Sequence, residues 1–253
     1  MFNFIHKFLS FIENICFPIT CCSCGAFVDS EGLCPECWKK IKWIDNPKCK
    51  ICGTPFELDI EAVCAECLRK RPHFDEAVSV MEYDDFSKGM ILRFKHGDTT
   101  YISRQLATWI YRAAENVIKN ADIIIPVPIH FFKRLKRKYN QSELLALELK
   151  KLSGISYEPR ILRKNKHTPQ QEGLSRIMRL KNVNGSFGVN SQYSDLLRGR
   201  TVVLVDDVLT TGATVNECSK ILKKHGAIKV TVLTVARVNY GTSRHFEKLM
   251  FPV

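Results

Sequence analysis

The chain has 253 residues, enough for one large domain or two unequal domains with a buried core. Its composition, with 45% hydrophobic and 25% charged residues, argues against intrinsic disorder. The formal net charge of +12 favours an anionic partner. Residues 133–183 carry 14 Lys and Arg against 4 Asp and Glu. Such a run fits either an anion-binding segment or a solubilising surface.

The N-terminal residues 1–17 predict an amphipathic helix that ends before Pro18. Lys7 and Glu13 interrupt the apolar run that a signal peptide requires. We expect this helix to pack on the protein itself or on a partner, and a place in a membrane interface stays open. Nowhere does the chain approach the roughly 18 apolar residues of a membrane-spanning helix, so we expect a cytoplasmic protein without a transmembrane segment.

Cysteine spacing is the strongest pattern in residues 18–72, which we expect to form a zinc-binding domain. Four Cys-x-x-Cys pairs supply two sets of four thiolates, and zinc prefers such a tetrahedral set. Gly25 and Gly53 follow the leading pairs, where a tight knuckle needs a positive φ angle. The predicted structural Zn²⁺ ligands are Cys21, Cys24, Cys34, Cys37, Cys49, Cys52, Cys64 and Cys67.

Other interpretations of these cysteines remain open. Buried cysteines or redox pairs are the alternative to metal ligands, and one shared zinc site is the alternative to two. The choice of Cys21 over the adjacent Cys22 rests on spacing alone. Four thiolates around one zinc ion leave no open position, so the predicted zinc is structural rather than catalytic.

From residue 73 to residue 253, the pattern changes to alternating strands and helices. Continuous aliphatic strands between helices predict an α/β domain, in which a parallel sheet is covered by helices on both faces. The predicted strands are 76–83, 121–128, 155–161, 201–207 and 228–236. The predicted helices are 86–97, 101–119, 141–152 and 213–225. Residues 163–185 predict a long basic loop, and a loop of that length is usually functional or mobile.

The segment VVLVDDVLTTGAT (202–214) predicts a ligand site. We expect the strand to end near Val205 and the next helix to begin near Thr214, so the segment lies where parallel sheets bind ligands. Hydroxyls and backbone N–H groups at a helix N-terminus form a cradle for one phosphate. The carboxylates of Asp206 and Asp207 would repel that phosphate, but they suit a vicinal diol or a metal ion. The combination indicates a ribose 5-phosphate.

This segment resembles the phosphoribosyl diphosphate motif of type I phosphoribosyltransferases. Three further segments, LRFKHGD (92–98), PVPIHFFKRLKRKYNQSELLA (126–146) and HTPQQEGLSRIMRLKNVNGSF (167–187), follow a Cys-rich N-terminus. Together they resemble the competence protein F family (ComF, ComFC) over nearly the whole chain. The family's Arg-Gly-Phe-Asn-Gln stands here as RKYNQ (137–141), with Lys in the place of Gly.

The resemblance implies a site for phosphoribosyl diphosphate with Mg²⁺, in which Asp206 and Asp207 meet the ribose hydroxyls and are the candidate catalytic residues. In a transferase, Asp207 is the candidate acid/base. The implied ligand-binding residues are Val127, Arg137, Asn140, Arg163, Asp206, Asp207, Thr210, Thr211, Gly212, Ala213 and Thr214. Residues 163–182 match the mobile loop that closes over the ligand in the transferases.

The resemblance also implies a role in natural transformation, the handling of imported single-stranded DNA at the cytoplasmic side of the inner membrane. Basic residues would follow the DNA backbone, and Phe131, Phe132 and Tyr139 are candidate stacking partners unless they are core residues. The candidate DNA-binding residues are Lys133, Arg134, Lys136, Arg137, Lys138, Lys164, Lys166 and Arg179.

Two functions from different classes therefore stand. The first is a zinc-ribbon protein that handles DNA and retains a phosphoribosyl diphosphate site. The second is an active phosphoribosyltransferase on an unknown acceptor, although residues 236–253 show no pattern that would recognise a base. A role as an adaptor for DNA-uptake proteins at the inner membrane is compatible with the first, and peripheral membrane association stays open.

Overall fold

The computed structural model describes residues 19–57, 62–96, 101–129, 139–165, 183 and 185–239. At its centre is a five-stranded sheet in the order β1-β7-β6-β2-β3, in which every neighbouring pair is parallel. Its strands are β1 (Glu76–Glu82), β2 (Ile123–Pro126), β3 (Ser156–Tyr157), β6 (Thr201–Leu209) and β7 (Lys229–Arg237). The predicted fold class is thereby confirmed.

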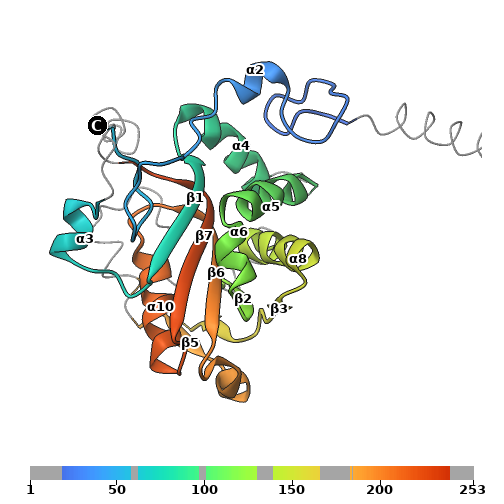
Figure 1. The fold of residues 1–253 in the computed structure, drawn as a ribbon. Helices are drawn as coiled ribbons and strands as arrows, with labels where there is room; N and C mark the ends of the chain where they lie inside the picture. The colour runs from blue at the N-terminus through green and yellow to red at the C-terminus, as the bar shows by residue number, and fades with distance from the viewer. Residues whose placement is uncertain are drawn as a thin grey trace, which may run out of the picture.

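Helices cover both faces of this sheet (Figure 1). The helices around it are α4 (Asp85–His96), α5 (Ile102–Ala113), α6 (Glu115–Lys119), α8 (Gln141–Ser153) and α10 (Ala213–Lys224). Side chains of β6 alternate between two hydrophobic clusters, as the two-residue period of a strand requires. Val203 and Val205 face α4, α5 and α8, whereas Val202 and Leu204 face α10.

Some elements differ from their predicted bounds. The helix expected over residues 101–119 is divided at Ala114 into α5 and α6, because the backbone of Ala114 leaves the helical region. Strand β6 continues to Leu209, since its register with β7 extends to Arg237. At the start of the expected loop 163–185, β4 (Leu162–Lys164) pairs antiparallel with β5 (Phe187–Val189), which follows the loop, and η1 (Ser191–Leu197) comes next. The predicted N-terminal helix and residues 166–182 lie outside the described residues.

The cysteine-rich module packs around the edge strand β1. Its two short helices, α2 (Pro35–Trp38) and α3 (Ala65–Arg69), belong to successive halves of the module. The first half contributes Cys22 and Ile41 to the α4–α5–α8 cluster, and the second contributes Ile51 to the α10 cluster. The two halves therefore lie on opposite faces of one sheet. The domain boundary between residues 72 and 73 stays a prediction.

The outer edge of β1 is covered by backbone hydrogen bonds from the same module. Ile44 N donates to Val80 O at 2.9 Å, and Glu82 N donates to Lys42 O at 2.8 Å. Further along β1, Ala77 N donates to Ile51 O at 2.7 Å. An edge strand otherwise leaves such groups unpaired, so the module closes this side of the sheet.

Candidate functional site

The eight predicted zinc ligands form two separate quartets. In each quartet the four Sγ atoms lie within 4.8 Å of one another. A zinc ion about 2.3 Å from each sulfur would space them about 3.8 Å apart in a tetrahedron. The Cys24–Cys34 sulfurs are 3.8 Å apart and the Cys52–Cys64 sulfurs 3.6 Å, so both quartets fit the metal. The two clusters are consistent with two zinc ribbons.

The two quartets are built on the same local structure. In each leading knuckle the glycine N–H donates to the carbonyl of the first cysteine at 2.9 Å. In each half, a backbone N–H of the trailing pair also donates to the first sulfur, from Cys34 to Cys21 and from Cys64 to Cys49, both at 3.3 Å. Burial opposes ionisation of Cys21, but the backbone N–H groups around its sulfur lower its pKa to about 6. These donors stabilise the thiolate that binds zinc.

Cys22 lies apart from the first quartet. Its side chain is buried in the α4–α5–α8 cluster, where Sγ is 3.9 Å from Met90 Sδ. Burial, followed by the nearby charge of Cys21, raises the pKa of Cys22 to about 12. The structure therefore places Cys21 with the other thiols and Cys22 in the core.

The second ribbon is attached directly to the sheet. Arg237, at the end of β7, is buried and its guanidinium donates to the carbonyl of Cys52. Burial opposes ionisation of Cys52, but Arg237 and the Thr54 hydrogen bonds outweigh it and lower its pKa to about 7. Gly53 comes so close to β1 that a Cβ atom there would lie 2.5 Å from Ala77 O.

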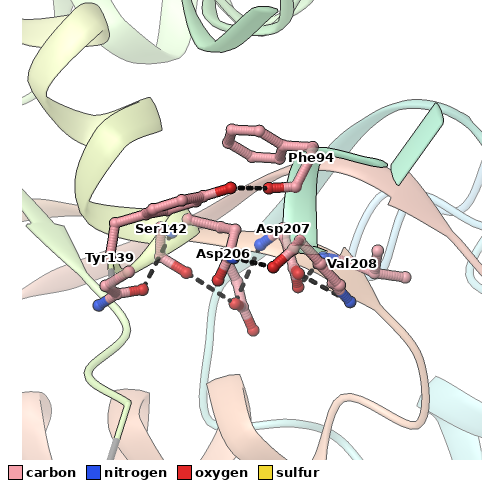
Figure 2. A network of polar contacts seen from close by, with 9 residues as sticks. Phe94, Tyr139, Ser142, Asp206, Asp207 and Val208 are labelled. Atoms are coloured by element: carbon pink, nitrogen blue, oxygen red, sulfur yellow. Dashed lines mark hydrogen bonds and ion pairs between the residues drawn. The ribbon is translucent and has the colours of Figure 1, made fainter. Parts of the chain in front are cut away.

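Asp206 and Asp207 lie in the C-terminal half of strand β6, toward the carboxyl end of the sheet (Figure 2). Asp206 Oδ1 accepts hydrogen bonds from Ser142 Oγ at 3.0 Å and from Asp207 N at 2.9 Å. Asp207 Oδ1 accepts from Val208 N at 2.7 Å. Both carboxylates are thus fixed in orientation, which a site for a diol or a cation requires.

A lysine of α4 forms an ion pair with this pair of aspartates. Lys95 Nζ lies 2.8 Å from Asp207 Oδ2, and each side chain is 16% exposed. Burial alone would lower the pKa of Lys95, but the Asp207 carboxylate outweighs it and raises the pKa above its usual value. Asp206 behaves differently, because burial and the adjacent charge of Asp207 raise its pKa to about 7.

The start of α8 holds three elements of the site together. Tyr139 OH donates to Phe94 O at 2.9 Å, and Gln141 Nε2 donates to Lys95 O at 3.1 Å (Figure 2 shows the first). Asn140 caps α8 by accepting from Ser142 N, while its Nδ2 donates to Val127 O at 3.1 Å. Residues 139–142 thus bind two carbonyls in the last turn of α4, the carbonyl of the residue after β2, and Asp206.

The turn between β6 and α10 is the segment that the sequence predicts as an anion cradle. Gly212 adopts a φ of 73° immediately before the helix, and Thr211 Oγ1 accepts from Ala213 N at 3.4 Å. The hydroxyl-bearing residues Thr210, Thr211 and Thr214 are only partly buried. The turn begins after Leu209, so the two aspartates lie within the end of β6 rather than after it, as a strand ending near Val205 would have placed them.

Most of the predicted DNA-binding residues lie outside the described residues. These are Lys133, Arg134, Lys136, Arg137, Lys138, Lys166 and Arg179. Lys164 is described, and its Nζ lies 5.4 Å from the ring centroid of Phe187. Arg163 is exposed on β4.

The sequence patterns missed Lys95 and Ser142 as partners of the aspartates. Lys95 is part of LRFKHGD, which supported the family resemblance, but nothing in that segment links it to β6. Ser142, the second residue of α8, lies in the segment 126–146 that also supported the resemblance, and nothing in that segment links it to β6. Both contacts join segments that are distant in sequence, so only the fold reveals them.

Two family models match the chain. A double zinc ribbon domain matches residues 12–68, and a phosphoribosyl transferase domain matches residues 149–249. The first includes both cysteine quartets, and the second includes Asp206, Asp207 and the cradle. Among the described parts of the chain, none of the helices has the length and apolar character to cross a membrane.

Curated relatives match across both parts of the chain. The competence protein F of Haemophilus influenzae is 34% identical over 87% of this chain and 98% of its own length. The DNA utilization protein YhgH of Escherichia coli K12 is 28% identical over 81% of this chain and 90% of its own length. The competence protein ComFC of Bacillus subtilis is 26% identical over 82% of this chain and 85% of its own length. The chain, with its double zinc ribbon and phosphoribosyltransferase domain, belongs to the competence protein F family.

Proposed function

We propose that this protein handles incoming single-stranded DNA in natural transformation, at the cytoplasmic side of the inner membrane, and that it binds phosphoribosyl diphosphate at Asp206 and Asp207. The first part is supported by the names of its relatives, which are competence and DNA utilization proteins. The second part is supported by one observation above all. Two fixed carboxylates stand directly before a helix N-terminal cradle, at the carboxyl end of a parallel sheet.

In this proposal each part of the site has its own role. Residues 210–214 hold the 5-phosphate through backbone N–H groups and hydroxyls. Asp206 and Asp207 accept hydrogen bonds from the ribose hydroxyls, and the segment with Val127, Arg137 and Asn140 faces the diphosphate. The oxygen donors here fit Mg²⁺, which would neutralise the charge of the diphosphate when it binds with the ligand. The zinc ions have a structural role.

Asn140 would act through position rather than through direct contact. Both polar ends of its side chain bind the protein itself, and it is 1% exposed. It holds Val127 in the segment that would face the diphosphate.

The ligand site is tested by titrating phosphoribosyl diphosphate with Mg²⁺ into the wild type and into the double variant Asp206→Asn/Asp207→Asn. Asp195→Asn is the control, because this carboxylate makes an exposed ion pair in η1. We expect the double variant alone to lose binding. Unchanged binding would refute the site, and normal transformation without binding would show that the site is not needed for DNA uptake.

DNA binding is tested by its dependence on salt. Reversing the charge of Lys133, Arg134, Lys136 and Arg137 should weaken binding to single strands. If each contacts one phosphate, the slope of log affinity against log salt falls by roughly 3. Reversal of Lys119 and Lys220 is the control. Binding that is absent, or that does not respond to salt, would exclude this mode of DNA handling.

An active phosphoribosyltransferase is the second candidate, and the pKa of Asp206 favours it. A carboxyl group with a pKa of about 7 is suited to transfer a proton near neutral pH. Asp207, paired with Lys95, would then accept hydrogen bonds from the ribose. Release of diphosphate in the presence of Mg²⁺ and an acceptor, lost in Asp206→Asn, is the result expected of this activity. If no acceptor class gives diphosphate release, the protein binds the ligand without transferring it.

A further inference from the structure

The two zinc ribbons share a repeated surface segment that begins at the first cysteine of the trailing pair and continues three residues past the last cysteine. The first ribbon has CPECWKK (34–40) and the second has CAECLRK (64–70). In both, the residue after the last cysteine donates its N–H to the carbonyl of the trailing pair's first cysteine, at 2.9 Å for Trp38 and 3.0 Å for Leu68. These two residues therefore occupy equivalent positions. Both are exposed, Trp38 to 47% and Leu68 to 73%.

The repeat extends to the neighbouring charges. Lys39 pairs with Glu36 at 3.3 Å, and Arg69 pairs with Glu66 at 3.0 Å, three residues apart in each case. The two segments thus share their backbone, their exposure and their ion pair. They differ in the apolar side chain, which is an aromatic ring in the first ribbon and an aliphatic group in the second.

Trp38 is held in place by two other tryptophans. Its ring centroid lies 4.6 Å from that of Trp43, with the planes tilted by 44°. Trp109 of α5 lies 5.3 Å from Trp43 and 6.4 Å from Trp38, in edge-on orientations. The cluster fixes the indole of Trp38 from within the protein while about half of the residue remains in water. A rigid, exposed aromatic ring loses little conformational entropy when a flat ligand stacks on it.

Three lysines follow Trp38 closely in the chain. Lys39, Lys40 and Lys42 are all exposed, and the only carboxylate in residues 36–43 is Glu36. Lys42 Nζ is 4.0 Å from Asp84 Oδ2, and its side chain is 64% exposed. Exposed ion pairs of this kind contribute only about 0–1 kcal/mol, so a phosphate can replace the carboxylate at little cost.

We propose that Trp38, with Lys39, Lys40 and Lys42, is a stacking platform for one base of single-stranded DNA. This inference rests on the proposed handling of single-stranded DNA and adds a contact in the first ribbon, outside the basic segment 133–138. An indole stacks on any base, while the lysines bind the flanking phosphates, so the platform would not select a sequence. Leu68 offers no aromatic face, so the second ribbon does not share this role.

The test compares three variants by their affinity for a labelled oligodeoxyadenylate of about 20 nucleotides, which covers the usual site sizes. We expect Trp38→Leu, which gives the first ribbon the residue of the second, to weaken binding about tenfold. Trp38→Phe should stay close to the wild type, because it keeps an aromatic face. Leu68→Ala should bind like the wild type. Zinc content is measured for each variant, and an unchanged value shows that the ribbons are intact.

An abasic oligomer of the same length separates stacking from charge. The wild type and Trp38→Leu should bind it equally, since it has phosphates but no bases. An equal loss on both oligomers, or an equal loss in Leu68→Ala, would overturn the platform. If the wild type binds single strands and Trp38→Leu binds them as tightly, the platform is wrong while the proposed function stands. If the wild type binds no single strands, both are overturned.

Discussion

Lys95 Nζ and Asp207 Oδ2 are 2.8 Å apart across the contact between α4 and β6. The same helix also contacts the first zinc ribbon, where Arg93 donates to the carbonyl of Ser23 within the Cys21–Cys24 knuckle. One helix therefore joins a zinc quartet to the candidate ribose site.

Replacing Lys95 should destabilise the protein. Lys95→Met leaves Asp207 partly buried without its cation and next to Asp206. We expect a loss of about 3 kcal/mol in the free energy of unfolding, at the low end for a broken buried pair because Asp206 can take up a proton. Urea unfolding at pH 8 measures it, with Lys88→Met on the same helix as the control. Equal stability of the two variants would show that the pair contributes nothing.

The stability of the wild type should depend on the protonation of Asp206. Its pKa is about 7 in the folded protein, against about 3.9 in an unfolded chain. The folded state therefore binds more protons between these values, and stability falls as the pH rises through them. From pH 6 to pH 8 the wild type should lose about 1 kcal/mol relative to Asp206→Asn. Urea unfolding of both proteins over this range measures the difference, and parallel profiles would contradict it.

The knuckle glycines should differ in their tolerance of alanine. Gly25 and Gly53 have φ angles of 78° and 69°, so alanine costs each about 1 kcal/mol. A Cβ atom meets nothing within 4 Å at Gly25 but lies 2.5 Å from Ala77 O at Gly53. We expect Gly53→Ala to lose roughly 1–3 kcal/mol more than Gly25→Ala in thermal or urea unfolding. Similar losses would mean that the second ribbon is not held against β1 in solution.

Zinc content should distinguish the adjacent cysteines. The purified protein should contain about two zinc ions per chain, since each quartet supplies four thiolates. Cys21→Ser should reduce this to about one. Cys22→Ser should keep both ions and instead lower stability, because Cys22 is buried in the core. Metal analysis by mass spectrometry, together with unfolding curves, gives both values. If Cys22→Ser loses a zinc ion and Cys21→Ser does not, then Cys22 is the zinc ligand and Cys21 is not.

The sequence predicted those features whose signal is local. Cysteine spacing determines which thiols can share a metal ion, and aliphatic strands between helices determine a parallel sheet. The aspartates and the cradle lie within 13 consecutive residues, so their proximity was also predictable. Lys95 and Ser142 reach the aspartates only through packing of α4 and α8, which no local pattern encodes. The hydrogen bonds of the Asn140 side chain to Val127 and Ser142 also come from the fold, and no local pattern predicts them.

The backbone hydrogen bonds along β1 imply that zinc, by keeping the ribbon module folded, also keeps the edge of the sheet covered. The ribbon module occupies the free edge of the sheet, at Ala77, Val80 and Glu82. Removal of zinc would free this edge while the rest of the sheet persists, and a free edge can pair with a strand of another chain. We therefore expect metal depletion to produce self-association before unfolding. In a cell short of zinc, the supply of this protein would be limited by aggregation of otherwise folded molecules.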